Sequence, residues 1–195
     1  NGYINIDNKK MSKSLGNFFT VREIADEFGY LPIRHFILSA HYRSPINFSR
    51  EIIAQSAAAL ERIFNCGADA EFYLANVKAD VSLPDENDAL ERARNAKRAF
   101  IEAMDDDFNT GSAIASVYDI VKELNLLVKN GASLTAVREV KALYDELTSL
   151  LGFVREEQSD ADFIREIEEQ IAARTAAKQQ KDYRRADEIR AALLE

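Results

Sequence analysis

A short polar stretch near the start of the chain is the main candidate for a functional site. Two lysines stand three residues apart, with hydroxyl residues around them and a glycine close behind. In order, these residues are Lys10, Met11, Ser12, Lys13, Ser14, Leu15, Gly16 and Asn17. Ammonium groups meet phosphate oxygens as compact point charges, while hydroxyls and loop amides donate hydrogen bonds. The stretch predicts a phosphate-binding loop, although two lysines at this spacing are by themselves more often an ordinary surface turn.

The elements that would position this loop are predicted to be mainly α-helical, because only seven glycines and three prolines interrupt 195 residues. Residues 1–8 resemble a strand or hairpin arm, and residues 9–20 a polar loop. Thr20 then caps a helix over 21–28, with Glu23 placed as in a capping box. The start of this helix would add favourable partial charge for an anion. A second helix over 31–39 is followed by a loop over 41–48.

An antiparallel four-helix bundle is expected over residues 49–152. Ser49 caps its first helix, which runs to about residue 74, and the others cover 86–105, 112–129 and 134–151. The first helix carries an apolar stripe at helical spacing, made of Ile52, Ile53, Ala57, Leu60 and Ile63. The full division is then 1–48, the strand arm with its polar loop and two helices; 49–152, the bundle; 153–161, a linker; and 162–195, a helical hairpin breaking near Lys181 and Asp182.

Charge and cysteine content restrict the function classes. The net charge of −8 argues against a chain that coats nucleic acid non-specifically, but residues 1–50 carry a local excess of three positive charges. The single cysteine, Cys66, excludes an intramolecular disulfide and a cysteine-rich metal site within this chain, and it is expected to be an ordinary buried helix residue. No apolar run is long enough for a membrane span, so we expect a soluble cytoplasmic protein without membrane contact. The chain begins at Asn1, inside an apparent strand, and is expected to be a fragment of a longer protein.

Three strings carry a resemblance to a known family. Residues 10–14 match the signature loop of class I aminoacyl-tRNA synthetases. Residues 41–49 (His-Tyr-Arg-Ser-Pro-Ile-Asn-Phe-Ser) and 102–110 (Glu-Ala-Met-Asp-Asp-Asp-Phe-Asn-Thr) are similar to strings of cysteinyl-tRNA synthetases at these distances after the loop. One departure is Gly111, where that family usually has proline.

The resemblance implies an enzyme that activates cysteine with ATP and Mg²⁺ and then esterifies the terminal adenosine of tRNA(Cys). Lys10 and Lys13 would act in catalysis, and the whole string from Lys10 through Met11, Ser12 and Lys13 to Ser14 would bind ATP. The family's other nucleotide motif, of His-x-Gly-His type, is absent, and so are its Cys, His and Glu zinc ligands. We therefore expect no metal site here, zinc only in a parent protein, no catalysis by this chain alone, and a monomer.

The resemblance also implies contacts with tRNA. Residues 1–48 would be the end of a catalytic domain, with the signature loop and stem-contact helices. Residues 49–152 would be a bundle of tRNA-binding type, and residues 162–195 the start of an anticodon-binding region. The candidate residues are Arg22, Arg34, His41, Arg43 and Arg50, and in the last hairpin Lys178, Lys181, Tyr183, Arg184 and Arg185. For each one, an intramolecular ion pair or a solvated helix face is the more common role of such a residue. Asp105, Asp106 and Asp107 are expected to form a helix-to-helix connection and not a metal cluster, because no calcium-loop pattern follows them.

Two alternative functions remain open on these residues. A ligase that joins cysteine to an amino sugar shares the phosphate loop, but does not need a complete tRNA-anticodon module. A bundle used only for docking RNA or protein needs no nucleotide chemistry. The terminal hairpin and the Asp-rich string favour the synthetase over the amino-sugar ligase, whereas the chain in isolation would behave as a docking bundle whatever its parent does.

Overall fold

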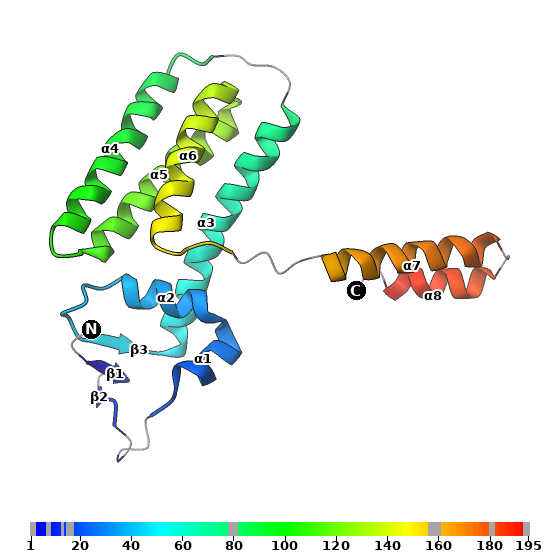
Figure 1. Cartoon of the computed structure of the whole chain (residues 1–195), viewed down its shortest axis with the longest axis horizontal. Helices are drawn as coiled ribbons and strands as arrows, with labels where there is room; N and C mark the ends of the chain where they lie inside the picture. Colours follow the sequence, from blue (N-terminus) through cyan, green and yellow to red (C-terminus); the bar gives the residue numbers. More distant parts are fainter. Residues whose placement is uncertain are drawn as a thin grey trace. The chain divides into compact units, whose positions relative to one another are not determined.

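Helices dominate the residues that the structure describes, which are 3–6, 9–12, 14, 18–77, 82–155, 161–179 and 182–192 of a computed structural model of the chain. The chain divides into two compact units, Asn1–Val154 and Arg155–Glu195 (Figure 1). The mainly α-helical class predicted from the sequence is confirmed. Among the described residues, no helix is both long and apolar enough to cross a membrane.

A three-stranded sheet in the order β2-β1-β3 begins the first unit. Strand β1 (Ile4–Ile6) pairs antiparallel with β2 (Lys9–Lys10) and parallel with β3 (Ile46–Phe48). Two sequence predictions are corrected here. Lys9 and Lys10 belong to a strand and not to the predicted 9–20 loop, and residues 46–48 of the predicted 41–48 loop form β3. Parallel pairing with β1 satisfies the backbone of β3, and such pairing leaves no local signal in so short a strand.

Helices α1 (Val21–Phe28) and α2 (Tyr30–Leu38) follow the sheet, with Gly29 between them at φ +80°. The bounds of α1 and its capping box are those predicted, while α2 begins and ends one residue earlier than predicted. A small core joins these helices to the sheet and to the start of the bundle. It contains Ile24, Ala25, Ile33, Phe36, Ile46, Phe48 and Ile53. Strand β3 and helices α1 and α2 therefore pack together against the start of α3.

The bundle is formed by α3 (Arg50–Asn76), α4 (Glu86–Asp105), α5 (Thr110–Asn130) and α6 (Leu134–Leu150). Helix α5 contacts the other three helices of the bundle. Helix α4 turns small side chains inward, namely Ala89, Ala93, Ala96 and Ala103, so α4 and α5 can pack closely. Ser49 accepts the predicted capping hydrogen bond at the start of α3, and Asn109 and Ser133 accept capping hydrogen bonds at the starts of α5 and α6. Helix α5 starts two residues before the predicted start, directly after its cap Asn109.

One end of the bundle is fastened by the buried carboxylate of Glu86. It accepts hydrogen bonds from the amides of Ser133 (2.6 Å) and Leu83 (2.8 Å) and from the Ser133 hydroxyl (2.7 Å). Burial raises the pKa of Glu86, but these three hydrogen bonds outweigh it, and the net pKa is lowered. The turn before α4 and the start of α6 are thereby joined through one side chain.

The second unit is the predicted helical hairpin, with α7 (Ala161–Gln179) packed against α8 (Tyr183–Ala192). The predicted break near residues 181 and 182 is confirmed at Asp182, whose amide donates to Ala177 O at 2.9 Å and whose carboxylate accepts from the amide of Arg185 at 3.1 Å. The side chain of Asp182 thus caps α8.

Candidate nucleotide-phosphate and RNA-contact sites

The first half of the predicted phosphate loop is fixed by the strand arm. Lys10 is the last residue of β2 and pairs with Asn5, and the amide of Met11 donates to Ile4 O at 3.0 Å. The Lys10 ammonium lies 5.7 Å from the centre of the Tyr3 ring, within the range of a cation–π contact. The hydroxyls of Ser12 and Ser14 lie 3.1 Å apart. Lys13, with residues 15–17, falls outside the described residues.

The helix start that follows the loop already carries an anion of its own. The Glu23 carboxylate accepts a hydrogen bond from the amide of Thr20 at 2.6 Å, and the Thr20 hydroxyl accepts from the amide of Glu23 at 3.2 Å. The hydrogen bonds from the Thr20 amide and hydroxyl lower the pKa of Glu23, so it is ionised at neutral pH. The partial positive charge of the helix start is therefore already neutralised by Glu23, and it does not support the predicted phosphate contact.

A cluster of polar side chains brings together two of the three strings that carry the family resemblance, residues 41–49 and 102–110. Asp107, in the turn between α4 and α5, accepts hydrogen bonds from the Tyr42 hydroxyl (2.8 Å) and from Arg43 Nη2 (3.2 Å), and its second oxygen lies 3.0 Å from Arg43 Nη2. Arg43 Nε also donates to the Tyr42 hydroxyl at 2.9 Å. The hydrogen bond to Tyr42 and the charge of Asp107 raise the pKa of Arg43, which stays cationic.

His41 completes this cluster. Its Nδ1 accepts a hydrogen bond from the amide of Arg43 at 3.2 Å, which leaves its Nε2, 3.7 Å from Asp107, to carry the proton. The ring of His41 stacks on that of Tyr42 with centroids 4.8 Å apart. The sequence analysis selected His41 and Arg43 for their charge, but it missed Tyr42 and the role of Asp107 as hydrogen-bond acceptor. These residues lie more than 60 positions from Asp107 in the sequence, so no local pattern joins them.

Three more arginines proposed for tRNA contact lie in the first unit. Arg34 donates to Leu151 O at 3.5 Å, and its guanidinium lies so close to Gly152 that a Cβ there would stand 2.5 Å from Nη1. Arg50 forms an ion pair with Glu27. Arg22 is exposed on α1. Arg34 thus holds α2 against the end of α6, and Arg50 has an intramolecular partner, so a contact with RNA remains a prediction for all three.

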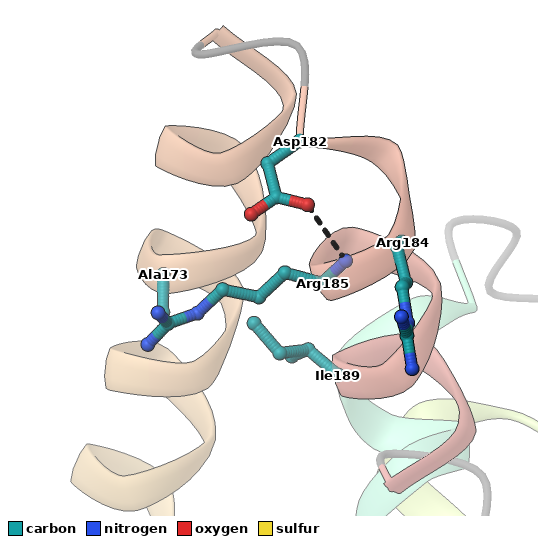
Figure 2. Close-up of a pocket in the computed structure, with 5 residues that line it drawn as sticks. All are labelled: Ala173, Asp182, Arg184, Arg185 and Ile189. Carbon is teal, nitrogen blue, oxygen red and sulfur yellow. Dashed lines mark hydrogen bonds between the residues drawn. The ribbon is translucent and has the colours of Figure 1, made fainter.

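The hairpin carries the remaining candidates. Lys178, Tyr183, Arg184 and Arg185 are exposed, and Lys181 falls outside the described residues. Figure 2 shows Arg185 reaching from α8 toward α7 near Ala173, while Arg184 points to the other side of α8. Both arginines are among the residues that line an open hollow of the hairpin, with Ala173, Asp182 and Ile189. Basic side chains beside an exposed tyrosine suit backbone and base contacts with single-stranded RNA.

The buried titratable groups show no arrangement for metal chemistry. Among the described residues, no group of three His, Cys, Asp or Glu side chains is placed to hold a metal ion. Cys66 is buried in α3, as predicted, and burial raises the pKa of its thiol to about 12. A thiol held in its protonated form is a poor zinc ligand, so this residue does not fit the zinc site of the family.

Comparison with protein families gives two matches on this chain. Residues 1–58 match the tRNA synthetases class I (C) catalytic domain, and residues 99–155 match the DALR domain. The first match contains the phosphate loop, the sheet and α2, and the second contains the Asp107 turn with α5 and α6. The cluster around Asp107 therefore contains residues of both matches, with His41, Tyr42 and Arg43 from the first and Asp107 from the second.

Three curated relatives of this chain share one name. The chain is 40% identical to a cysteine--tRNA ligase of Clostridioides difficile and 43% identical to one of Lachnoclostridium phytofermentans, in each case over all of this chain and 42% of the relative. A cysteine--tRNA ligase of Caldicellulosiruptor saccharolyticus is 41% identical over 97% of this chain and 40% of its own length. The chain thus spans about two fifths of the length of these relatives.

A solved structure has a similar fold. A chain in the crystal structure of the ternary complex of Agrobacterium radiobacter K84 agnB2 LeuRS, tRNA and LeuAMS matches with a TM-score of 0.59 and 25% identity, over 77% of this chain and 22% of that one. The fold, the phosphate-loop string and the sequence similarity agree, and the chain is a homologue of cysteine--tRNA ligases that corresponds to about two fifths of their length.

Proposed function

We propose that this chain supplies the ATP-phosphate loop and part of the tRNA-contacting surface of a cysteine–tRNA ligase. Such an enzyme joins cysteine to AMP with release of pyrophosphate, and then transfers the cysteinyl group to the end of tRNA(Cys). The observation that carries the proposal is the Lys10–Ser14 string, held by β2 at its first lysine, in a chain whose curated relatives are cysteine--tRNA ligases over its whole length.

The role proposed for the loop is electrostatic. Attack of the cysteine carboxylate on the α-phosphorus of ATP pushes negative charge onto the departing pyrophosphate, and Mg²⁺ would accompany ATP. Lys13 and Lys10 would neutralise that charge as it develops, and Ser12 and Ser14 would donate hydrogen bonds to phosphate oxygens. The anchoring of Lys10 by strand pairing gives this ammonium a defined starting position. Cys66, the single cysteine of this chain, does not suit the family's zinc site, and the proposed role of the loop does not involve zinc.

The role proposed for the helices is to hold RNA. The first unit offers the exposed Arg22, and Arg43 with Tyr42 beside it, while the hairpin offers Lys178, Tyr183 and the two arginines Arg184 and Arg185. Because the chain as a whole is acidic, phosphate contacts must be local. We expect tRNA binding by the 195-residue chain to be weak and to fall steeply with salt.

Substitution of Lys13 tests the role of the loop. In a cysteine–tRNA ligase containing this sequence, Lys13→Ala should slow ATP–pyrophosphate exchange by about 10²–10³ and change the Kd for tRNA little, since the ammonium acts on the transition state. Lys129→Ala, which removes an exposed lysine from the end of α5, is the matched control and should leave exchange unchanged. Equal exchange rates for the Lys13 variant and the wild type would refute the role given to the loop.

A salt titration tests the role of the helices. For the 195-residue chain and a tRNA(Cys) transcript, Arg184→Gln should reduce the slope of log Kobs against log salt by about one, the value for one lost phosphate contact. Arg94→Gln removes a guanidinium that is paired with Glu139 in the bundle, and should leave the slope unchanged. Binding that does not depend on salt would argue against phosphate contacts of any kind.

A further inference from the structure

The turn between α4 and α5 exposes an aromatic ring on strained backbone. Asp107 and Phe108 both have φ of +54°, and they are the described residues other than glycine with positive φ. An aromatic residue in this region costs free energy that glycine would not, and such strain persists only where surrounding contacts fix it. The Phe108 side chain is 64% exposed, so the strain is not offset by burial of the ring.

The backbone of this turn is fixed from both sides. The amide of Phe108 donates to Met104 O at 3.1 Å, its carbonyl accepts from the amide of Thr110 at 2.7 Å, and the amide of Asn109 donates to Ala103 O at 2.9 Å. The side chain of Asp107, one residue earlier, is held by Tyr42 and Arg43. The backbone of Phe108 is therefore held in a hydrogen-bonded turn, which lowers the entropic cost of binding a partner at this position.

The chemistry beside the ring favours a base over a phosphate. Tyr42 and Arg43 are exposed near the Asp107 carboxylate that they share, and the Arg43 guanidinium lies 5.3 Å from the centre of the Tyr42 ring. Asp105 and Asp106 are exposed on the same turn and would repel a phosphate. A nucleobase is uncharged, stacks on aromatic rings and guanidiniums, and can donate from its amino groups to carboxylates.

We infer that Phe108, the residue that follows the Asp107 bound by Tyr42 and Arg43, forms a stacking site for an unpaired base of the bound RNA, with Asp107 as the positioning residue. The inference rests on the proposed function, because it takes RNA as the partner. It adds a kind of contact that differs from phosphate binding by the exposed arginines, since stacking has no dependence on counterion release.

The absence of tryptophan from the sequence makes a direct test possible. Phe108→Trp keeps an aromatic surface and introduces the sole indole of the chain. Addition of a tRNA(Cys) transcript at low salt should quench its fluorescence, and a fully paired RNA duplex should not. Phe72→Trp is the matched control, because Phe72 lies on α3 and is 71% exposed; its fluorescence should not change with either RNA.

Phe108→Gly separates binding from folding. Glycine relieves the positive φ and removes little buried surface, so thermal stability should be equal or higher, while Kd for the transcript should rise by about 5- to 100-fold with an unchanged salt slope. A Kd equal to that of the wild type would overturn the inference and leave the proposed function standing. If sedimentation then showed that self-association is lost in this variant, the ring would instead belong to a protein contact. Failure of the wild-type chain to bind the transcript at all would count against the RNA role proposed for the helices, and so against both.

Discussion

Gly67, in the middle of α3, is a position where two opposing effects can be weighed from the structure. A Cβ at Gly67 would lie 2.8 Å from Tyr144 Oη on α6 and 3.1 Å from its Cε1. The Tyr144 hydroxyl donates to Ile63 O at 2.7 Å, one helical turn before Gly67, and this tyrosine is buried. Gly67 therefore lets the α6 tyrosine reach the backbone of α3.

Substitution of Gly67 by alanine should destabilise the first unit despite the better helix propensity of alanine. Propensity favours alanine by about 1 kcal/mol. Against this, the 2.8 Å contact forces the Tyr144 ring to move, and overpacking of this kind costs about 1–3 kcal/mol. Loss of the bond to Ile63 O leaves a buried hydroxyl without its acceptor, at about 1–3 kcal/mol more. The net loss is about 1–5 kcal/mol, or a fall in Tm of roughly 2–20 °C for a unit of this size.

Thermal and urea unfolding, followed by circular dichroism at a helix wavelength, measure this loss. Tyr144→Phe is the partner variant, because it removes the hydroxyl that the new methyl group would meet first. In that background, Gly67→Ala should cost about 1 kcal/mol less than in the wild type, a coupling that a double-mutant cycle resolves. A rise in Tm for Gly67→Ala alone would show that propensity dominates and that the close approach of α3 and α6 is not as described.

The remaining predictions concern buried titratable groups. Glu86→Ala should destabilise the first unit by about 2–4 kcal/mol in urea unfolding, because the three donors on its carboxylate lose their acceptor; Glu86 has a lowered pKa, so its contribution is present at neutral pH and is lost as the pH falls below about 4.3. His35 is buried between Tyr118 and Phe153, and burial lowers its pKa. As the pH falls, His35 is therefore protonated in the unfolded chain before it is protonated in the folded chain. The free energy of unfolding should decrease below about pH 6.5, by at most about 1.4 kcal/mol per pH unit, and His35→Leu should remove this slope. The Cys66 thiol, whose pKa is about 12, should react with a thiol reagent at neutral pH only after unfolding. Rapid labelling of the native chain would contradict the burial of this thiol.

The sequence predicted the elements whose signals are local. Helices α1 and α4 have the predicted bounds, because a capping box and a long amphipathic pattern each specify where a helix begins and ends. The bundle follows from the spacing of apolar residues, and Gly131, which ends α5 in a left-handed conformation, is a local signal of the same kind.

Features that depend on long-range pairing could not be predicted in this way. Strand β3 is three residues long, too short for a periodic pattern, and it exists because β1 lies beside it. The cluster at Asp107 joins residues 64 and 65 positions apart, and each partner considered alone is an ordinary polar surface residue. Similarly, the charge of Arg34 suggested an RNA contact, whereas the structure adds a bond to Leu151 O that only the packed helices bring within reach. Tertiary contacts decided these cases, and no local propensity encodes them.

The cluster at Asp107 lies on a continuous path between the two proposed sites of the first unit. Lys10 is held by β1, β1 pairs with β3, the residues just before β3 include Tyr42 and Arg43, and these are bonded to the turn that begins α5. Proximity effects in group transfer require reacting atoms to be placed within fractions of an ångström. If RNA is bound by the bundle and ATP by the loop, the distance between them must be fixed by packed structure and not by a tether. The parallel pairing of β1 with β3 and the ion pair of Arg43 with Asp107 are the two links through which packed structure would fix that distance.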